Sequence, residues 1–203
     1  MRTLDVLTLE KRKRVARETL EIYAPIAMRL GMNDIRIEYE ELGFQAIWPM
    51  RAERIRGAVL AARGNRKEMV VTLEAALSER LSSEGLTARV EGREKHLYSI
   101  YEKMRDKRRS FSEIMDVYGF RVVVENVDAC YRALGIVHNL YKPIPGKFKD
   151  YSAIPKTTGY QSLHTVLFGP YGSPIEVQIR TEEMDLIAER GVAAHWTYKF
   201  GGD

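Results

Sequence analysis

The sequence predicts an α+β fold, a mixed β-sheet of about five strands flanked by helices and preceded by a helical segment. Three observations lead to this prediction. Apolar residues recur at helical intervals up to about residue 84. Beyond residue 86, β-rich segments alternate with helical ones, which is typical of a sheet with helices packed on it. Finally, 163–168 and 174–181 flank a glycine-containing turn, as in a β-hairpin.

The N-terminal part of the chain is expected to be a series of helices. The first should stop at Gly31, because glycine readily adopts the backbone conformation that ends helices. Asn33 and Asp34 are candidates for the cap of the second. We expect Gly64-Asn65 to separate the third helix from the fourth. The predicted helices cover 9–30, 33–48, 51–63 and 66–83.

The remainder of the chain alternates between strand and helix patterns. β-Branched and aromatic residues dominate 117–124, which therefore reads as a strand. In 93–107, Leu97 and Ile100 lie on one apolar face of an expected helix. A polar stripe one turn apart on that helix would contain Lys95, Ser99 and Lys103. The expected strands are 87–90, 117–124, 163–168 and 174–181, and the expected helices are 93–107, 127–140 and 182–199.

Size and composition fit one globular domain with a helical appendage. The chain has 203 residues and a net charge of +4, which favours anionic ligands but does not by itself predict nucleic-acid binding. Cys130 is its one cysteine, so we expect no intramolecular disulfide and a reducing, cytoplasmic location. No apolar run reaches the length of a membrane span, so we expect no membrane partner.

The last expected strand has the clearest pattern. Its alternation sets Glu176, Gln178 and Arg180 on one face, with apolar residues on the other. A half-exposed strand with a solvated face is one interpretation of this pattern. The other is a cleft lined by these side chains, to which His164 on the hairpin partner would contribute.

A second carboxylate stands just before the expected strand 117–124. Asp116 at that strand's start, together with Glu176 on a neighbouring strand, could hold a magnesium ion, which prefers carboxylates and substrate phosphates. An aspartate at a strand entry or turn explains Asp116 equally well. On the strand itself, Arg121 and Gly119 share the face opposite to the apolar residues.

Basic residues cluster in two places, on 93–103 and on the loop 142–156. Together they could neutralise a triphosphate, and a generic basic rim is the alternative. Tyr160 lies between Gly159 and Gln161 and could stack on a base, although core packing accounts for it as well.

Other chemistries lack the necessary residues. The histidines are far apart in the sequence and form no HxxxH pattern, so a histidine-rich metal site is unsupported. Neither GxxxxGK[ST] nor GxGxxG occurs. Cys130 has apolar neighbours on an expected helix and is better explained by packing than by nucleophilic chemistry.

Taken together, several segments closely resemble the RelA/SpoT homologue family, stringent-response enzymes that make and often also hydrolyse guanosine tetra- and pentaphosphate. The resemblance covers essentially the whole chain and is greatest to the SpoT-type bifunctional proteins. The segments that carry it are 92–100, Asp116 with 120–122, 149–151, 159–164, 176–181 and 191–196.

The resemblance implies a nucleotidyltransferase-like synthetase domain that moves the β,γ-pyrophosphate of ATP to the 3′-hydroxyl of GDP or GTP. It also implies a Mg²⁺ cofactor bound by Asp116 and Glu176, the two catalytic positions. The positions matching the ATP side are Arg93, Lys95, Ser99, Lys103, Arg121, Lys147 and Lys149. Tyr160 matches the residue that stacks on guanine, and the other acceptor-side positions are Lys156, Gln161, His164, Gln178 and Arg180.

The sequence departs from the family pattern at two points. Lys147 stands where bifunctional members usually have Arg, and lysine lacks the planar fork needed for a bidentate contact. The His and His-Asp metal site of the family's hydrolase half has no counterpart, so we expect no hydrolase activity. We therefore divide the chain into 1–31, a remnant of the hydrolase domain, 32–84, a helical linker, and 85–203, the synthetase domain.

Two rival functions remain open. One is a catalytically weak or silent module that binds guanine nucleotides for regulation. The other is an RNA-binding domain, which the interrupted pattern of aromatic and basic residues disfavours. Regulatory partners would act through C-terminal domains of the long family members that this chain does not contain.

Overall fold

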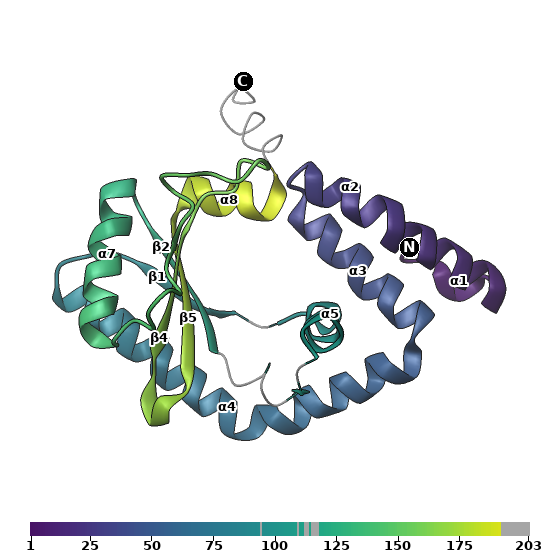
Figure 1. Ribbon diagram of the computed structural model, residues 1–203, viewed down its shortest axis with the longest axis horizontal. Coiled ribbons are helices and arrows are strands. Elements are labelled where there is room, and N and C mark those ends of the chain that lie inside the picture. The colour runs from purple at the N-terminus through teal and green to yellow at the C-terminus, as the bar shows by residue number, and fades with distance from the viewer. Residues whose placement is uncertain (94, 109, 112–113, 115–117, 192–203) are drawn as a thin grey trace.

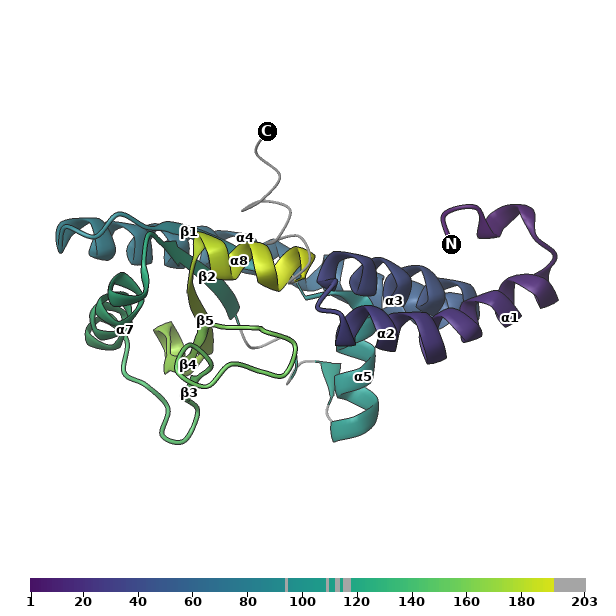
Figure 2. The same cartoon turned by 90° about the horizontal axis from the view of Figure 1, so that it is seen from above.

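The computed structural model describes residues 1–203 except 94, 109, 112–113, 115–117 and 192–203, and leaves out the side chains of 62–66, 107 and 171. A five-stranded sheet stands on one side of the molecule and a group of N-terminal helices on the other (Figure 1). A long helix, α4, runs past both of them (Figures 1 and 2). The predicted fold class is confirmed.

The N-terminal helices form an antiparallel pair. The first arm runs through α1 (Leu9–Glu18), a π-helical turn (Thr19–Tyr23) and α2 (Ala24–Arg29). It ends at Gly31, whose φ of 73° lies in the left-handed region, as predicted. The second arm is α3 (Asn33–Ile47), and the residue before it, Met32, makes no side-chain cap. A 3₁₀ turn (Leu4–Val6) precedes α1.

The two helices predicted at 51–63 and 66–83 are in fact one helix, α4 (Pro49–Ser83). The prediction relied on Gly64-Asn65 as a break. A glycine inside a helix costs only about 1 kcal/mol relative to alanine, and packing readily offsets that cost. Here both ends of α4 are anchored, by Ala52 and Ile55 in one buried cluster and by residues 73–81 in another.

The sheet is mixed, with the strand order β1-β2-β5-β4-β3. β2 and β5 are parallel and the other neighbouring pairs are antiparallel. The hairpin of β4 and β5 is confirmed, with a 3₁₀ turn (Pro170–Gly172) between them. The strand bounds are β1 (Arg89–Arg93), β2 (Tyr118–Val124), β3 (Lys149–Asp150), β4 (Leu163–Phe168) and β5 (Pro174–Thr181).

The remaining helices are α5 (Leu97–Lys107), α7 (Val127–Leu140) and α8 (Glu182–Arg190). The helix predicted over 127–140 is confirmed. The prediction of a helix over 93–107 was wrong in its first turn, because α5 begins at Leu97. Arg93 closes strand β1, because β1 extends beyond the predicted 87–90 to pair with β2, and Lys95 lies in the connection. The helix predicted over 182–199 ends at Arg190, where Gly191 has a φ of 86°. Residues 192–203 lie outside the described part of the chain.

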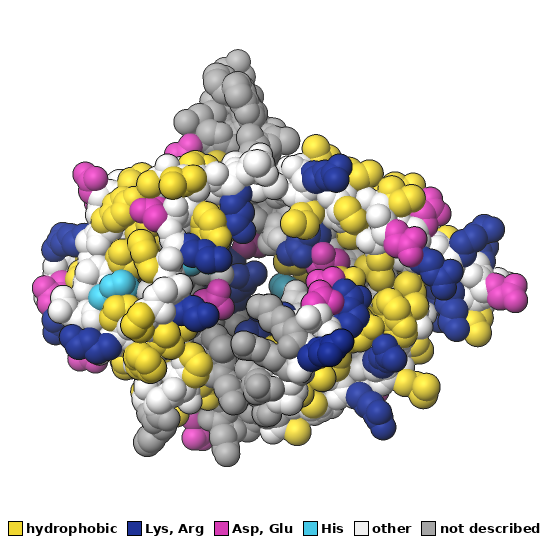
Figure 3. Space-filling model, viewed as in Figure 1, with side chains coloured by type: hydrophobic (Ala, Val, Ile, Leu, Met, Phe, Trp, Pro, Cys, Tyr) yellow, Lys and Arg dark blue, Asp and Glu magenta, His cyan; other side chains and the backbone are white. Residues whose placement is uncertain are grey.

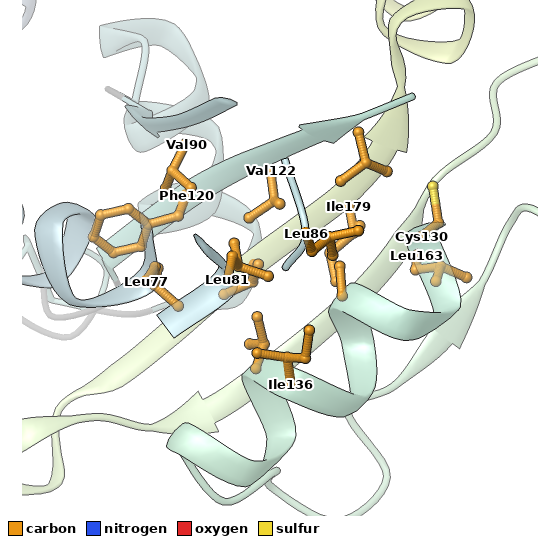
Figure 4. Close-up of a cluster of buried hydrophobic side chains, with 14 of the residues drawn as sticks. Leu77, Leu81, Leu86, Val90, Phe120, Val122, Cys130, Ile136, Leu163 and Ile179 are labelled. Carbon is orange, nitrogen blue, oxygen red and sulfur yellow. The ribbon is translucent and has the colours of Figure 1, made fainter. Parts of the chain in front are cut away.

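The main core lies between one face of the sheet and the helices α4 and α7 (Figure 4). Phe120 and Val122 of β2 and Ile179 of β5 point into it. Cys130 is buried there too, and this desolvation raises the pKa of its thiol to about 11, which fits the predicted packing role. A second cluster joins α3, α4 and α5, with the rings of Phe44 and Tyr101 stacked at 4.8 Å. The opposite face of the sheet carries mostly polar side chains.

No helix among the described residues combines the length and the apolar character that crossing a bilayer requires.

Candidate functional site

The polar face of the sheet presents two rows of side chains that run across the strands. In one row the directly opposed residues are Glu91, Arg121, Gln178, His164 and Lys149, one from each strand. The neighbouring row contains Arg93, Gly119, Glu176 and Val166. Opposed residues on paired strands share a face. The prediction that Glu176, Gln178 and Arg180 share the polar face is therefore confirmed.

A cavity of about 680 Å³ opens between this face, the helices α2, α3, α5 and α8, and the loop 156–160. We call it the central cavity. Basic and acidic side chains surround the hollow between the two halves of the molecule (Figure 3). Its size is within the range of small-molecule sites. The predicted site residues that line it are Arg93, Lys156, Tyr160, His164, Gln178 and Arg180.

Tyr160 is the centre of an aromatic and cationic group. Its hydroxyl lies 2.7 Å from Nε2 of His164. The Lys156 ammonium is 5.1 Å and the Arg180 guanidinium 5.5 Å from the centre of the Tyr160 ring, within cation–π range. Burial, together with the charges of Arg180, Lys156 and other cations, lowers the pKa of His164 to about 4. His164 is therefore neutral at pH 7 and exchanges a hydrogen bond with Tyr160.

Gln178 joins the arginines of two strands. Its Oε1 accepts hydrogen bonds from Arg93 at 3.1 Å and from Arg180 at 2.6 Å. The Arg180 residue is only 2% exposed, and its Nη1 lies 3.3 Å from Oδ1 of Asp185 on α8. Burial lowers the pKa of Arg180, which nevertheless keeps its charge because arginine titrates far above neutrality. The arrangement fixes two cations at the wall of the cavity.

Glu176 lies two residues before Gln178 on the same face of β5 and is partly buried. It makes no hydrogen bond or ion pair within the described part of the chain. Beside it, Gly119 leaves room, because a Cβ at that position would meet only Arg93 atoms, at 3.5 Å and beyond. Asp116 lies outside the described residues, so the pairing of the two carboxylates stays a prediction. In the described ranges, no three His, Cys, Asp or Glu side chains gather as a metal site.

Other predicted site residues do not line the central cavity. Lys147 and Lys149 are exposed on the far side of β4, although Lys149 opposes His164 across the strands. Gln161 turns away and donates to the Ser152 carbonyl at 3.1 Å. Ser99 and exposed Lys103 lie on α5, and the Lys95 ammonium donates to the Ile114 carbonyl.

Arg121 is held against α8 rather than in the central cavity. It forms ion pairs with Asp185, at 3.3 Å, and with Glu189. The sequence interpretation missed both carboxylates. The two residues are four positions apart on the helix that follows β5, so they lie on one face of it. This spacing could have indicated a shared partner on the sheet.

The helices of the N-terminal pair also contribute to the cavity, which the sequence interpretation did not anticipate. Asn33, Arg36 and Glu40 of α3 line it. The Arg36 guanidinium is held by Glu40 at 2.6 Å and by Asn33 at 2.7 Å. Burial, partly offset by Arg36, raises the pKa of Glu40. A polar wall thus faces the sheet across the cavity.

Comparisons with known proteins agree with this architecture. Residues 92–203 match the model of the region found in RelA/SpoT proteins. The chain is 59% identical over its whole length to the bifunctional (p)ppGpp synthase/hydrolase SpoT of Escherichia coli, of which it covers 29%. It is 45% identical to a GTP pyrophosphokinase of Myxococcus xanthus, with 99% of this chain and 27% of the relative aligned. It thus spans less than a third of the length of these curated relatives.

The fold also resembles that of a solved structure, the small alarmone synthetase 1 of Bacillus subtilis bound to its product pppGpp. The TM-score is 0.53 at 24% identity, over 72% of this chain and 83% of the other. At this identity the likeness concerns the fold alone. With the matched family region covering more than half of the sequence, the chain belongs to the RelA/SpoT family.

Proposed function

We propose that the chain is a GTP/GDP pyrophosphokinase domain that transfers the β,γ-pyrophosphate of ATP to the 3′-hydroxyl of GDP or GTP. The observation that carries this proposal is the central cavity, which gathers an aromatic ring, a neutral histidine and several fixed cations. Glu176 lies outside its lining, two residues from Gln178 on the same face of β5. Relatives named GTP pyrophosphokinase and the solved product complex of a structural neighbour support it.

The acceptor nucleotide would occupy the Tyr160 end of the cavity. Stacking of a base on an aromatic ring contributes about 1–3 kcal/mol. Lys156 and Arg180 lie within cation–π distance of the same ring, so they place positive charge where phosphates of a stacked nucleotide would be. Neutral His164 orients the Tyr160 hydroxyl without adding a further charge.

The donor nucleotide would be held by the cations on the β1–β2 side, with Arg93 fixed by Gln178. Family resemblance also assigns Ser99 and the lysines at 95, 103, 147 and 149 to the donor, although Lys147 and Lys149 lie at the opposite, β3 edge of the sheet. Phosphoryl-type transfer depends mainly on positioning and on charge stabilisation, so fixed cations matter more than a covalent nucleophile.

The residues fit a Mg²⁺ ion. Glu176 is a carboxylate without a partner among the described residues, and opposite it on β2 Gly119 has no side chain that could fill the space next to Arg93. Magnesium commonly takes one or two carboxylates and completes its shell with phosphates and water. Glu176 and Asp116 would hold the ion, which would neutralise charge on the transferred pyrophosphate.

In the proposed reaction, Glu176 accepts the proton of the acceptor's 3′-hydroxyl. The oxygen then forms a bond to the β-phosphorus of ATP, while the bond between that phosphorus and the bridging oxygen to the α-phosphate breaks. AMP leaves with this oxygen. Arg93 and the neighbouring lysines would stabilise the charge of the leaving and transferred groups.

The test is incubation of the chain with ATP, Mg²⁺ and labelled GDP or GTP, followed by separation of nucleotides. We expect equal amounts of AMP and of a 3′-pyrophosphorylated product. Guanine-nucleotide binding without turnover would instead favour the second candidate, a regulatory binding module. The ion pairs that occupy Arg121 favour that candidate, because they hold a donor-side cation away from the cavity.

We also propose the division into 1–31 as a remnant of the hydrolase domain, 32–84 as a linker and 85–203 as the synthetase domain. The N-terminal pair packs against the proposed synthetase part, for example where Phe44 of α3 stacks on Tyr101 of α5. A Cβ on Gly191 would lie 2.9 Å from the Leu30 carbonyl oxygen. Hydrolysis by this chain is not expected. Incubation with guanosine tetraphosphate and Mn²⁺ would test this.

A further inference from the structure

The inner face of α8 carries two carboxylates that both bind one arginine. Asp185 and Glu189 are one helical turn apart. Oδ1 of Asp185 lies 3.3 Å from Nη1 of Arg121, and Glu189 accepts a hydrogen bond from its Nη2. The Arg121 side chain is only 16% exposed, and its Nε is buried without a hydrogen-bond partner. Among the described residues, both carboxylates that form ion pairs with Arg121 thus come from α8.

Glu189 lines the central cavity, whereas Arg121 does not. Arg93 and Arg180, on the strands that flank β2 on either side, both line it. Glu189 therefore pairs with the Arg121 guanidinium, which could otherwise bind an anion on the polar face of the sheet. Any polyphosphate that recruits Arg121 must compete with this carboxylate.

Glu189 is shared with the N-terminal helices. The Asp34 side chain at the start of α3 is hydrogen-bonded to Glu189. Desolvation, this hydrogen bond and the charge of Glu189 raise the pKa of Asp34. Burial raises the pKa of Glu189, but the charge of Arg121, the bond with Asp34 and the charge of Arg180 outweigh it and lower that pKa. The two shifts run in opposite directions, which makes Asp34 the donor of the hydrogen bond to Glu189.

The spacing between α3 and α8 is fixed by backbone contact close to this pair. Gly31 precedes α3 and Gly191 follows α8. A Cβ on Gly191 would come within 2.9 Å of the Gly31 carbonyl carbon. A displacement of the N-terminal pair would therefore also change the contact between Asp34 and Glu189.

We propose that Glu189 is a positioning residue that holds Arg121 on α8 and away from the donor nucleotide, and that Asp34 weakens this hold. The inference rests on the proposed function, since it takes ATP as the polyanion that recruits Arg121. The bond from Asp34 occupies part of the acceptor capacity of the Glu189 carboxylate. The N-terminal helices thereby determine how readily Arg121 can bind the donor nucleotide.

Two changes should therefore act in opposite directions. Glu189→Gln removes the competing charge and should lower the KM for ATP about fivefold, with the KM for GDP changed less than about twofold. Asp34→Ala strengthens the hold and should raise the KM for ATP about twofold. In the Glu189→Gln background, Asp34→Ala should have no further effect, because Glu189 transmits it.

Two control variants separate this effect from general electrostatics. Glu102 also lines the cavity, but its ion pair is with Arg105 of its own helix, so Glu102→Gln measures the effect of a lost cavity charge alone. Glu182 lies on α8, is 68% exposed and pairs with Arg89, so Glu182→Gln should leave both KM values unchanged. Arg121→Ala combined with Glu189→Gln should abolish the gain of the latter.

The experiment measures initial rates against ATP and GDP and, independently, the binding of a non-hydrolysable ATP analogue by calorimetry. Tighter analogue binding by Glu189→Gln than by Glu102→Gln supports the inference, even if no variant turns over and the proposed function fails. Turnover by the unmodified chain with equal ATP constants in Glu189→Gln and Glu102→Gln overturns the inference and leaves the function intact. Weaker analogue binding by Glu189→Gln, with an unchanged thermal midpoint, also overturns it.

Discussion

The two ends of the polar face of the sheet differ in how their charges are paired. At the Glu176 end, a partly buried carboxylate lies opposite Gly119 and has no partner among the described residues. At the α8 end, Asp185 lies within 3.3 Å of both Arg121 and Arg180. A paired charge has already been compensated by the protein, whereas an unpaired one remains free to act on a ligand. Glu176 is therefore expected to contact the reacting atoms, whereas Asp185 is expected to hold Arg121 and Arg180 in position.

The largest effect on the rate of synthesis is expected from a change at Glu176. Glu176→Gln keeps the size of the side chain but removes the base and the metal ligand, so synthesis should fall by about 10²–10⁴-fold. The rate of AMP formation measures it, and circular dichroism checks the fold. Glu125→Gln, an exposed carboxylate after β2, is the matched control and should retain full activity. Activity of Glu176→Gln within tenfold of the unmodified chain would remove this residue from the chemistry.

His164, between the two ends, should make stability depend on pH. Its folded-state pKa of about 4 is below the ordinary value of 6.5, so the unfolded chain binds more protons between these values. The free energy of unfolding should therefore fall as the pH drops through this window. The contribution of His164 to this fall is about 2 kcal/mol between pH 7 and pH 5. Urea unfolding at the two pH values measures the loss. His164→Gln should reduce it, and an identical loss in the variant would contradict the assignment.

The aromatic group tests whether the Tyr160 end of the central cavity binds the acceptor. Tyr160→Ala should weaken guanine-nucleotide binding by about 1–3 kcal/mol, because the stacking surface is lost. Tyr160→Phe retains the ring and loses only the hydrogen bond to His164, so it should cost less than about 1 kcal/mol. Calorimetry with GDP compares the two variants. Equal losses would mean that the hydroxyl, and not the ring, carries the contact.

The smallest effect is expected at Lys147, which is exposed and does not line the central cavity. Lys147→Arg restores the residue usual in bifunctional family members. A flexible, solvated cation contributes little, so the KM for ATP should change less than about threefold. A larger improvement would show that the loop closes over the donor when both nucleotides are present.

Much of the site could be predicted from alternation along single strands. The period of two in β5 placed Glu176, Gln178 and Arg180 together, and the turn chemistry predicted the β4–β5 hairpin. The register that brings Arg121 opposite Gln178 could not be predicted, since strand order depends on contacts between distant segments.

The errors have different causes. The helical pattern of α5 was extended backwards over Arg93, because local periodicity does not show where pairing with β2 begins. Asp185 and Glu189 were overlooked because acidic residues on an amphipathic helix usually face solvent, and only the tertiary structure turns these two towards buried arginines. The one-piece helix α4 was missed because packing at both of its ends overrides a local glycine signal.

The continuity of α4 has a mechanical consequence. At 1.5 Å per residue, its 35 residues form a strut about 50 Å long that enters both hydrophobic clusters. One residue inserted near its middle would turn one cluster by about 100° relative to the other, whereas seven would nearly restore the phase. The angular relation between the two walls of the cavity is thus encoded in the number of residues along a single helix.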